Sequence, residues 1–151
     1  MFMQKLQMII FVCSKIISTE HFFIGNTVME TAEIIVTKKH YISIAQDFSR
    51  TPGVRLIQQG GFSGEAFRDE ILFPKMLEAI QKNQKIVVDL DYTAGYASSF
   101  LEEAFGGLVR RGLSPEEILQ HLEIKSDQEP FWADDILNDF IPNGLDTKSL
   151  R

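Results

Sequence analysis

The sequence predicts an α/β domain in which helices pack on a small mixed or parallel sheet of four strands. A short run of β-branched and apolar residues at positions 86–90 is typical of a central strand that is covered on both faces. Signals that begin and end helices follow this run directly. Strand-like and helix-like patterns also alternate along the chain, which favours a sheet with helices packed on it.

The composition limits the classes of function. A chain of 151 residues with 44% hydrophobic residues and 12 phenylalanines predicts one folded domain, and 24% charged residues argue against a membrane protein. The net charge of −6 disfavours nucleic-acid binding. Cys13 is the only cysteine and the three histidines are scattered, so we expect no disulfide, metal or cofactor and a reducing cytoplasm.

The first 28 residues do not fit the pattern of the rest. The apolar stretch at 8–17 is too short to span a membrane and contains Lys15. A secretory signal is the alternative, but no clear cleavage site follows it. We therefore predict a non-conforming N-terminal extension at 1–28, a single α/β domain at 29–145 and a polar tail at 146–151.

The first half of the predicted domain contains two strands. Glu33–Thr37 is interpreted as a strand, with a continuation to Tyr41 left open, and Ser43 with Gln46 caps a short helix that ends before Pro52–Gly53. Val54–Gln58 is interpreted as the second strand.

Ser63 is the predicted N-cap of a long helix that carries Phe67 and Ile71 on one face. Pro74 removes a hydrogen bond and clashes with the carbonyl of Glu70, so the sequence predicts a kink or a restart of the helix there, and an end near Asn83.

The helix after the central strand is well marked at both ends. Ser99 and Glu102 have the spacing of a capping box, which predicts a helix start at Ser99. Arg110, Arg111 and Gly112 have the charge and the flexibility that end a helix.

The last third repeats the pattern of strand and helix. Ser114, Pro115 and Glu117 predict another helix start. Leu122–Lys125 is the predicted last strand. A final helix opens at Pro130 and is predicted to place one apolar face inward, formed by Trp132, Ile136, Leu137, Phe140 and Ile141.

Ser98 is the candidate for regulation. The predicted cap at Ser99 leaves Ser98 exposed and one position outside the helix, where a phosphoryl group would meet the positive helix end. No histidine or aspartate of triad spacing accompanies it, so nucleophilic hydrolysis is not expected. A loop serine without a role is the plain alternative.

A ligand site is the rival interpretation. The glycine-rich loop Gly60–Gly64 precedes a helix, and backbone N–H groups near Gly61, Ser63 and Gly64 are candidates for holding an anion. Asp89 and Asp91 share one face at the end of the central strand, where α/β proteins often bind substrates. An ordinary turn and solvated acids are the structural interpretation of the same residues, because the loop lacks a P-loop lysine.

Several separated motifs together resemble the STAS-like domains of unknown function found in bacteria, over about Glu33–Ile141. These motifs are PGVR at 52–55, SGEAFR at 63–68, LFP at 72–74, VVDLD at 87–91 and GYASSFLEEAFGGL at 95–108. STAS domains include anti-sigma-factor antagonists, in which a histidine-kinase-like ATPase phosphorylates a serine between a central strand and the next helix. Ser98 matches that serine, whereas Ala97 and Phe100 depart from the usual aspartate and glycine.

The resemblance implies a cytoplasmic, non-enzymatic regulatory module in signal transduction. It implies a protein partner, such as a serine kinase of the histidine-kinase-like ATPase class, rather than nucleic acid or membrane. We expect that partner to contact Tyr96, Ser98 and the exposed side chains of Glu102 and Glu103. A homodimeric scaffold that uses the aromatic residues Phe131 and Trp132 is a third possibility.

Overall fold

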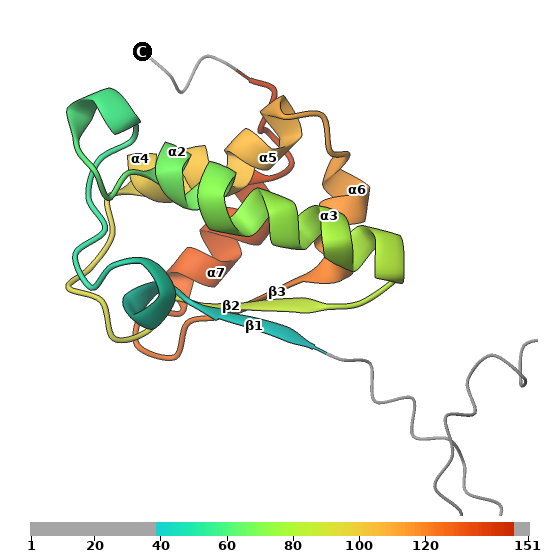
Figure 1. The fold of residues 1–151 in the computed structure, drawn as a ribbon, viewed down its shortest axis with the longest axis horizontal. Helices are drawn as coiled ribbons and strands as arrows, with labels where there is room; N and C mark the ends of the chain where they lie inside the picture. The colour runs from blue at the N-terminus through green and yellow to red at the C-terminus, as the bar shows by residue number, and fades with distance from the viewer. Residues whose placement is uncertain (1–38, 147–151) are drawn as a thin grey trace, which may run out of the picture. The chain divides into compact units, whose positions relative to one another are not determined.

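The computed structural model describes residues 39–146. These residues form a parallel sheet of three strands in the order β1 (His40–Ser43), β2 (Ile86–Asp89) and β3 (Leu122–Lys125), with helices between the strands (Figure 1). The α/β class is thus confirmed, and the sheet is parallel. A fourth strand is not found between residues 39 and 146, and the predicted strand Glu33–Thr37 and extension 1–28 lie outside the described residues.

The two faces of the sheet differ. All four residues of β2 are buried, as predicted for a central strand. The register aligns Ile42 with Val88 and Ile124 on the face that contacts the helices. On the opposite face Tyr41 is aligned with Val87, and Tyr41 is 54% exposed. Figure 1 shows α2, α3, α5 and α6 together on one side of the sheet.

The segment after β1 contains one confirmed helix and one wrong prediction. A π-helical turn, η1 (Ile44–Phe48), follows β1, although no side chain of Ser43 caps it; instead the Ser43 N–H donates to the Asp47 carboxylate at 2.8 Å. The predicted strand Val54–Gln58 is wrong. The carbonyl oxygens of Val54 and Arg55 accept hydrogen bonds from the start of the next helix, and a 3₁₀ turn, η2 (Ile57–Gln59), follows, so this backbone does not join the sheet.

The long helix runs without a break from α2 (Gly64–Phe67) through η3 (Arg68–Leu72) to α3 (Phe73–Lys82). The Ser63 hydroxyl accepts a hydrogen bond from the Ala66 N–H at 3.1 Å, which confirms the predicted N-cap. Pro74 lies in the first turn of α3, directly after the π-helical turn. The hydrogen-bond pattern changes there, but Leu72 and Phe73 keep helical backbone angles, so the helix does not restart at Pro74 as one alternative predicted.

The central helix comprises α4 (Ser98–Leu101), η4 (Glu102–Gly106) and α5 (Gly107–Arg110). Its N-cap is Ala97 and no side chain caps the start, so the predicted capping box of Ser99 and Glu102 is wrong. Glu102 is instead held by arginines, as described below. Gly112 has a φ of 102° just after the helix, as its predicted role in the helix end requires.

The C-terminal third follows the prediction closely. Helix α6 (Pro115–His121) has the predicted capping box, in which the Ser114 hydroxyl and the Glu117 carboxylate each accept from the other residue's N–H. Strand β3 follows, and then α7 (Phe131–Asp135) and η5 (Ile136–Phe140) form the last helix. Ile136 and Ile141 are fully buried in the core. In the part of the chain from 39 to 146, no helix is long and apolar enough to cross a bilayer.

Candidate functional site

Ser98 is the first residue of the central helix and its side chain is exposed. It lies inside the helix rather than one position outside it, because Ala97 has the extended backbone of an N-cap. The structure therefore moves the helix start by two residues, from a predicted N-cap at Ser99 to Ala97. Every residue from Phe100 to Val109 is buried, so Ser98 is an exposed hydroxyl at the start of a helix that otherwise lies in the core.

The loop that leads to Ser98 is held by its own side chains. The Tyr96 hydroxyl donates to the carbonyl oxygen of Leu90 at 2.8 Å, and the Gly95 N–H donates to the Thr93 hydroxyl at 3.4 Å. Burial raises the pKa of the Tyr96 phenol well above its ordinary value. Tyr96 thus anchors the loop, and its half-buried ring offers less surface to a partner than the sequence led us to expect.

A second loop lies beside this one at the same end of the domain (Figure 1). The Ala94 N–H donates to the carbonyl oxygen of Arg50 at 2.7 Å. The aromatic rings of Tyr96 and Phe48 both lie near the buried Phe100, with centroids 5.9 and 6.3 Å from it. The exposed apolar side chains of this end are Leu56, Ile57, Phe62 and Tyr92. The surface around Ser98 is therefore built from two packed loops.

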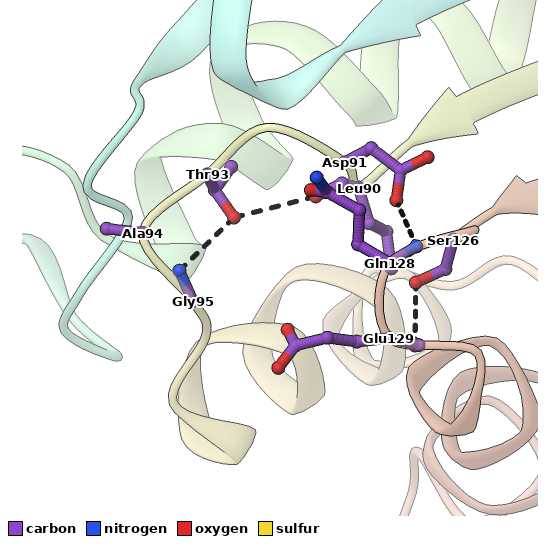
Figure 2. A pocket seen from close by; sticks show the side chains of 8 residues that line it. All are labelled: Leu90, Asp91, Thr93, Ala94, Gly95, Ser126, Gln128 and Glu129. Atoms are coloured by element: carbon purple, nitrogen blue, oxygen red, sulfur yellow. Dashed lines mark hydrogen bonds between the residues drawn. The ribbon is translucent and has the colours of Figure 1, made fainter.

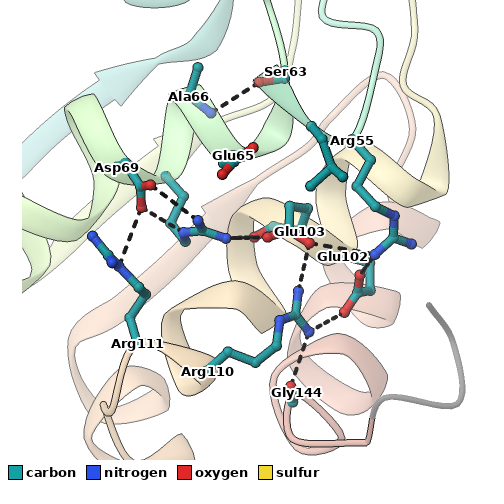
Figure 3. Close-up of polar contacts among 12 residues, drawn as sticks. Arg55, Ser63, Glu65, Ala66, Asp69, Glu102, Glu103, Arg110, Arg111 and Gly144 are labelled. Atoms are coloured by element: carbon teal, nitrogen blue, oxygen red, sulfur yellow. Dashed lines mark hydrogen bonds and ion pairs between the residues drawn. The ribbon is translucent and has the colours of Figure 1, made fainter. Parts of the chain in front are cut away.

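Glu102 and Glu103 are buried, each with only 7% of its surface exposed. This burial contradicts the prediction that they lie on an exposed face of the helix. Figure 3 shows both carboxylates surrounded by arginines. Glu102 pairs with Arg55 and, at 2.6 Å, with Arg110; Glu103 pairs with Arg110 at 2.9 Å and with Arg68. These ion pairs satisfy charges that would otherwise be costly to bury.

The network continues to the surface through Asp69. Burial opposes the charge of Arg68, but its hydrogen bonds to Asp69 and Glu103 outweigh burial and raise its pKa. The hydrogen bond from Arg68 likewise lowers the pKa of Asp69. Arg111 lies 3.5 Å from Asp69 and stacks its guanidinium over the Phe73 ring. Arg110 and Arg111, which were predicted as the charges at the helix end, thus also pair with specific acids.

Glycines allow this helix to be buried. A Cβ on Gly64 would overlap the carbonyl oxygen of Phe100, so α2 can cross α4 only with glycine there. A Cβ on Gly106 would lie 2.8 Å from the carbonyl oxygen of Phe140, and one on Gly107 would overlap Arg68. Gly64 in the predicted anion loop and the glycine pair of the SSFLEEAFGGL motif therefore have structural roles in close packing.

Asp89 and Asp91 lie together at the carboxyl end of β2, as predicted, but they are buried rather than solvated. Lys125 reaches both, at 3.3 Å from Asp89 and 2.8 Å from Asp91, and the Tyr41 hydroxyl donates to Asp89. The hydrogen bond to Asp89 raises the pKa of the Tyr41 phenol. The hydrogen bond to Asp91 raises the pKa of the Lys125 ammonium group.

Asp91 also organises the segment that follows β3. Its carboxylate accepts hydrogen bonds from the N–H groups of Gln128, at 2.9 Å, and Asp127, at 3.2 Å. Burial opposes its ionisation, but the hydrogen bonds from Lys125 and these two N–H groups outweigh burial and lower its pKa. Asp91 is thus an ionised acid that ties two loops together.

A pocket of about 120 Å³ opens between these loops (Figure 2). It lies at the carboxyl ends of β2 and β3, the usual ligand position in open α/β sheets. Its lining residues are Leu90, Asp91, Thr93, Ala94, Gly95, Ser126, Gln128 and Glu129. Asp89 is absent from this lining, and the loop Gly60–Gly64 does not contribute to it either.

The loop Gly60–Gly64 is poorly suited to hold an anion. The Gly64 N–H donates to Val54 at 2.9 Å and the Glu65 N–H donates to Arg55 at 3.0 Å, while Ser63 caps the following N–H. The donors at the helix start are therefore already engaged. The glycine loop and the two aspartates also have different neighbours, so the structure does not join them into the single site that the rival interpretation requires.

Sequence reasoning missed the basic partners of the acids. Arg55, Arg68 and Lys125 lie 47, 35 and 34 residues from Glu102, Glu103 and Asp91, respectively. The only indication of these partners in the sequence was the composition of the helix. Adjacent acids in a helix of apolar residues need cations beside them if the helix is buried. Among residues 39–146, no group of three histidine, cysteine, aspartate or glutamate side chains is placed to hold a metal ion.

The structure thus defines a small α/β domain whose central helix is buried and begins at an exposed serine. Residues 63–132, somewhat less than half of the chain, match the model of the family described as STAS-like domain of unknown function (DUF4325). The resemblance to STAS-like domains is confirmed over these residues, which include Ser98; the PGVR motif lies before them. Neither a curated protein nor a solved structure matches the chain.

Proposed function

We propose that the chain is a non-enzymatic regulatory module that binds a protein partner through the end of the domain around Ser98, and that phosphorylation of Ser98 switches this binding. The observation that carries the proposal is the position of Ser98, an exposed hydroxyl at the first residue of the buried central helix. The match to a STAS-like family supports a module of this type.

The local charge also favours a switch. Residues 92–101 contain no charged side chain, and residues 49–64 contain only Arg50 and Arg55, in a chain with a net charge of −6. Interface cores are commonly poor in charge and rich in aromatic residues, and each of these two loops has one exposed aromatic side chain, Phe62 or Tyr92. A phosphoryl group would add a charge of −1.5 to about −2 to this surface and would disfavour a docked partner.

The partner class that we propose is a serine kinase of the histidine-kinase-like ATPase class, acting in the cytoplasm. A kinase must both bind this surface and reach the hydroxyl, and the exposure of Ser98 at a helix start meets the second requirement. Glu102 and Glu103 are not proposed as direct contacts, because they are buried. Their place in the proposal is to hold the helix that presents Ser98.

Capture from native lysate tests this function. The wild-type chain and the variants Ser98→Asp, Ser98→Ala and Ser99→Asp are compared by mass spectrometry, with phosphopeptide mapping of the wild type. We expect an ATPase-class partner that Ser98→Asp loses and Ser98→Ala retains, and a phosphate on Ser98. A partner captured equally well by Ser98→Asp would contradict the switch.

The pocket of about 120 Å³ supports a second candidate, a small-ligand site. Its volume would hold a few water molecules or one small polar group. Asp91 would bind such a ligand only by giving up existing hydrogen bonds. Stoichiometric copurification of a small molecule that Ala94→Trp abolishes would favour this candidate over partner binding.

A further inference from the structure

The pocket between the loops that follow β2 and β3 has an acidic lining (Figure 2). Its volume is about 120 Å³, and its lining residues include the acids Asp91 and Glu129 but no lysine, arginine or histidine. The hydroxyl groups of Thr93 and Ser126 and the side chain of Gln128 belong to the same lining. A hollow lined by acids and hydroxyl groups suits a small ligand that carries positive charge and donates hydrogen bonds.

Glu129 supplies a half-buried carboxylate to this pocket. Figure 2 shows its side chain extending from the loop after β3 toward Gly95 on the opposite loop. The Trp132 Nε1–H donates to Glu129 Oε2 at 3.1 Å, and no lysine or arginine of residues 39–146 pairs with this carboxylate. The buried acids of the central helix, in contrast, all pair with arginines. Burial raises the pKa of the Tyr96 phenol, and the negative charge of Glu129 adds to this rise.

The surroundings of the pocket carry excess negative charge. Lys125 lies 3.3 Å from Asp89, 2.8 Å from Asp91 and 3.2 Å from Asp127. One ammonium group therefore faces three carboxylates, and it does not pair with Glu129 as well. A further cation at Glu129 would reduce this imbalance, and partial burial strengthens its attraction to the carboxylate.

We propose that this pocket binds a guanidinium group, and that Glu129 is the residue that pairs with it. The inference rests on the small-ligand site proposed above and names the class of its ligand. A guanidinium is planar, always charged and more weakly hydrated than an ammonium ion, so it suits a half-buried site better. Its fork of N–H donors matches a carboxylate, and the bond from Trp132 occupies only Oε2 of Glu129.

Such a group can enter without breaking the contacts that hold the two loops. Asp91 keeps Lys125 and the two backbone N–H groups that it binds, because Glu129 takes the cation in its place. The Ser126 hydroxyl donates to the Glu129 carbonyl oxygen at 2.7 Å, and the Thr93 hydroxyl donates to the Leu90 carbonyl oxygen at 3.5 Å. Both hydroxyl oxygens keep acceptor capacity for the remaining N–H groups of a guanidinium.

An NMR titration of the full chain tests the pocket without a partner. The probe is Nα-acetyl-argininamide, and the matched control is the corresponding citrulline compound, which has nearly the same shape but no charge. The chain has one tryptophan, so the Trp132 indole N–H gives a single signal that reports on Glu129. We expect the arginine probe to shift this signal and the Gly95 and Gln128 amide signals saturably, with a Kd of roughly 1–10 mM. The citrulline compound should bind at least tenfold more weakly.

Variants connect the binding to the pocket. Glu129→Gln removes the charge but keeps an acceptor for Trp132, and it should weaken binding of the arginine probe at least tenfold. Asp127→Asn is the control, because Asp127 is an exposed acid of the same loop that does not line the pocket; it should change the Kd less than about twofold. Ala94→Trp fills the pocket and should abolish binding, and it decides the test if Glu129→Gln does not fold.

Three results would overturn the proposal: no saturable shift with the arginine probe, equal binding of the citrulline compound, or undiminished binding by both Glu129→Gln and Ala94→Trp. The source of the guanidinium is a second question. Displacement of a captured partner by the arginine probe, but not by the citrulline compound, identifies an arginine of the partner. A guanidinium compound that copurifies with the wild type but not with Glu129→Gln identifies a free ligand.

The titration uses neither a partner nor a phosphate. Its failure would therefore reject the guanidinium site and leave the proposed switch at Ser98 untouched. Conversely, a partner captured equally well by Ser98→Asp, together with a titration that depends on Glu129, would reject the switch and support the guanidinium site.

Discussion

The backbone N–H of Glu102 donates to the carbonyl oxygen of Ser98, so an exposed serine and a buried glutamate share one helical turn. Glu102 in turn pairs with Arg55 from the neighbouring loop and with Arg110 from the end of the same helix. A charge added at Ser98 would therefore lie one turn from a buried ion-pair network. This relationship links the surface proposed for partner binding to the core.

The serines at two helix starts should differ in their effect on stability. The Ser63 hydroxyl caps α2 and is fully buried, so Ser63→Ala should lower the free energy of unfolding by about 1–2 kcal/mol. Ser98→Ala and Ser99→Ala should each change it by less than about 0.5 kcal/mol, because neither side chain caps α4. Urea unfolding checks all three variants, and a large loss for Ser99→Ala would restore the capping box that the structure rejects.

The helix crossing at Gly64 should tolerate no side chain. Gly64→Ala places a Cβ on the Phe100 carbonyl oxygen and should cost roughly 2–3 kcal/mol of unfolding free energy. Gly61→Ala is the matched control from the same loop, since no atom lies within 4 Å of its Cβ. Thermal unfolding of the two variants measures the difference, and equal melting temperatures would refute the close crossing.

The buried acids should matter more than exposed ones. Glu103→Ala removes a partner of Arg68, whose side chain is only 7% exposed, and should cost about 3 kcal/mol of unfolding free energy. Lys82→Ala, which breaks the exposed pair with Glu78, should cost less than about 0.5 kcal/mol. Chemical denaturation compares the two; similar losses would show that the Glu103 network is no stronger than a surface pair.

Local signals predicted much of the fold. The caps at Ser63 and Ser114, the central strand and Leu122–Lys125 all depend on residues a few positions apart, and the structure confirms each. The predicted strand Val54–Gln58 failed because its carbonyl groups cap a helix, a tertiary contact that alternation of residue types does not reveal. The alternation of residue types in Val54–Gln58 fits an extended loop as well as it fits a strand.

The candidate site was only half predictable. The position of Ser98 between strand and helix follows from local pattern, with the helix start displaced by two residues. The burial of Glu102 and Glu103 does not, because it depends on arginines that are distant in sequence. Adjacent acids at a helix start fit a solvated face equally well, and only the folded chain distinguishes the two.

Low pH should selectively weaken the hydrogen bonds that the Asp91 carboxylate accepts. Its pKa lies below the ordinary 3.8 in the folded chain, so its stabilisation is complete at neutral pH and is lost as pH falls through 3.8 toward the folded value. Asp91→Asn should cost about 2 kcal/mol of unfolding free energy at pH 7, and this difference should shrink below about pH 4.

Asp127→Asn is the matched control, because Asp127 pairs with the same Lys125 but is 78% exposed. Its cost should stay below about 0.5 kcal/mol at every pH. Unfolding curves between pH 3 and 7 provide the measurement. If the effect of Asp91→Asn does not depend on pH, the ionised state of Asp91 does not contribute to stability.

The most direct measurement of the central claim is the affinity of the purified chain for its captured partner, by calorimetry, before and after phosphorylation of Ser98. We predict at least a tenfold loss of affinity on phosphorylation, or about 1.4 kcal/mol, with full recovery after phosphatase treatment. The Ser98→Ala variant should bind like the unmodified chain and should not respond to the kinase. Equal affinities of the phosphorylated and unmodified chains would contradict the account.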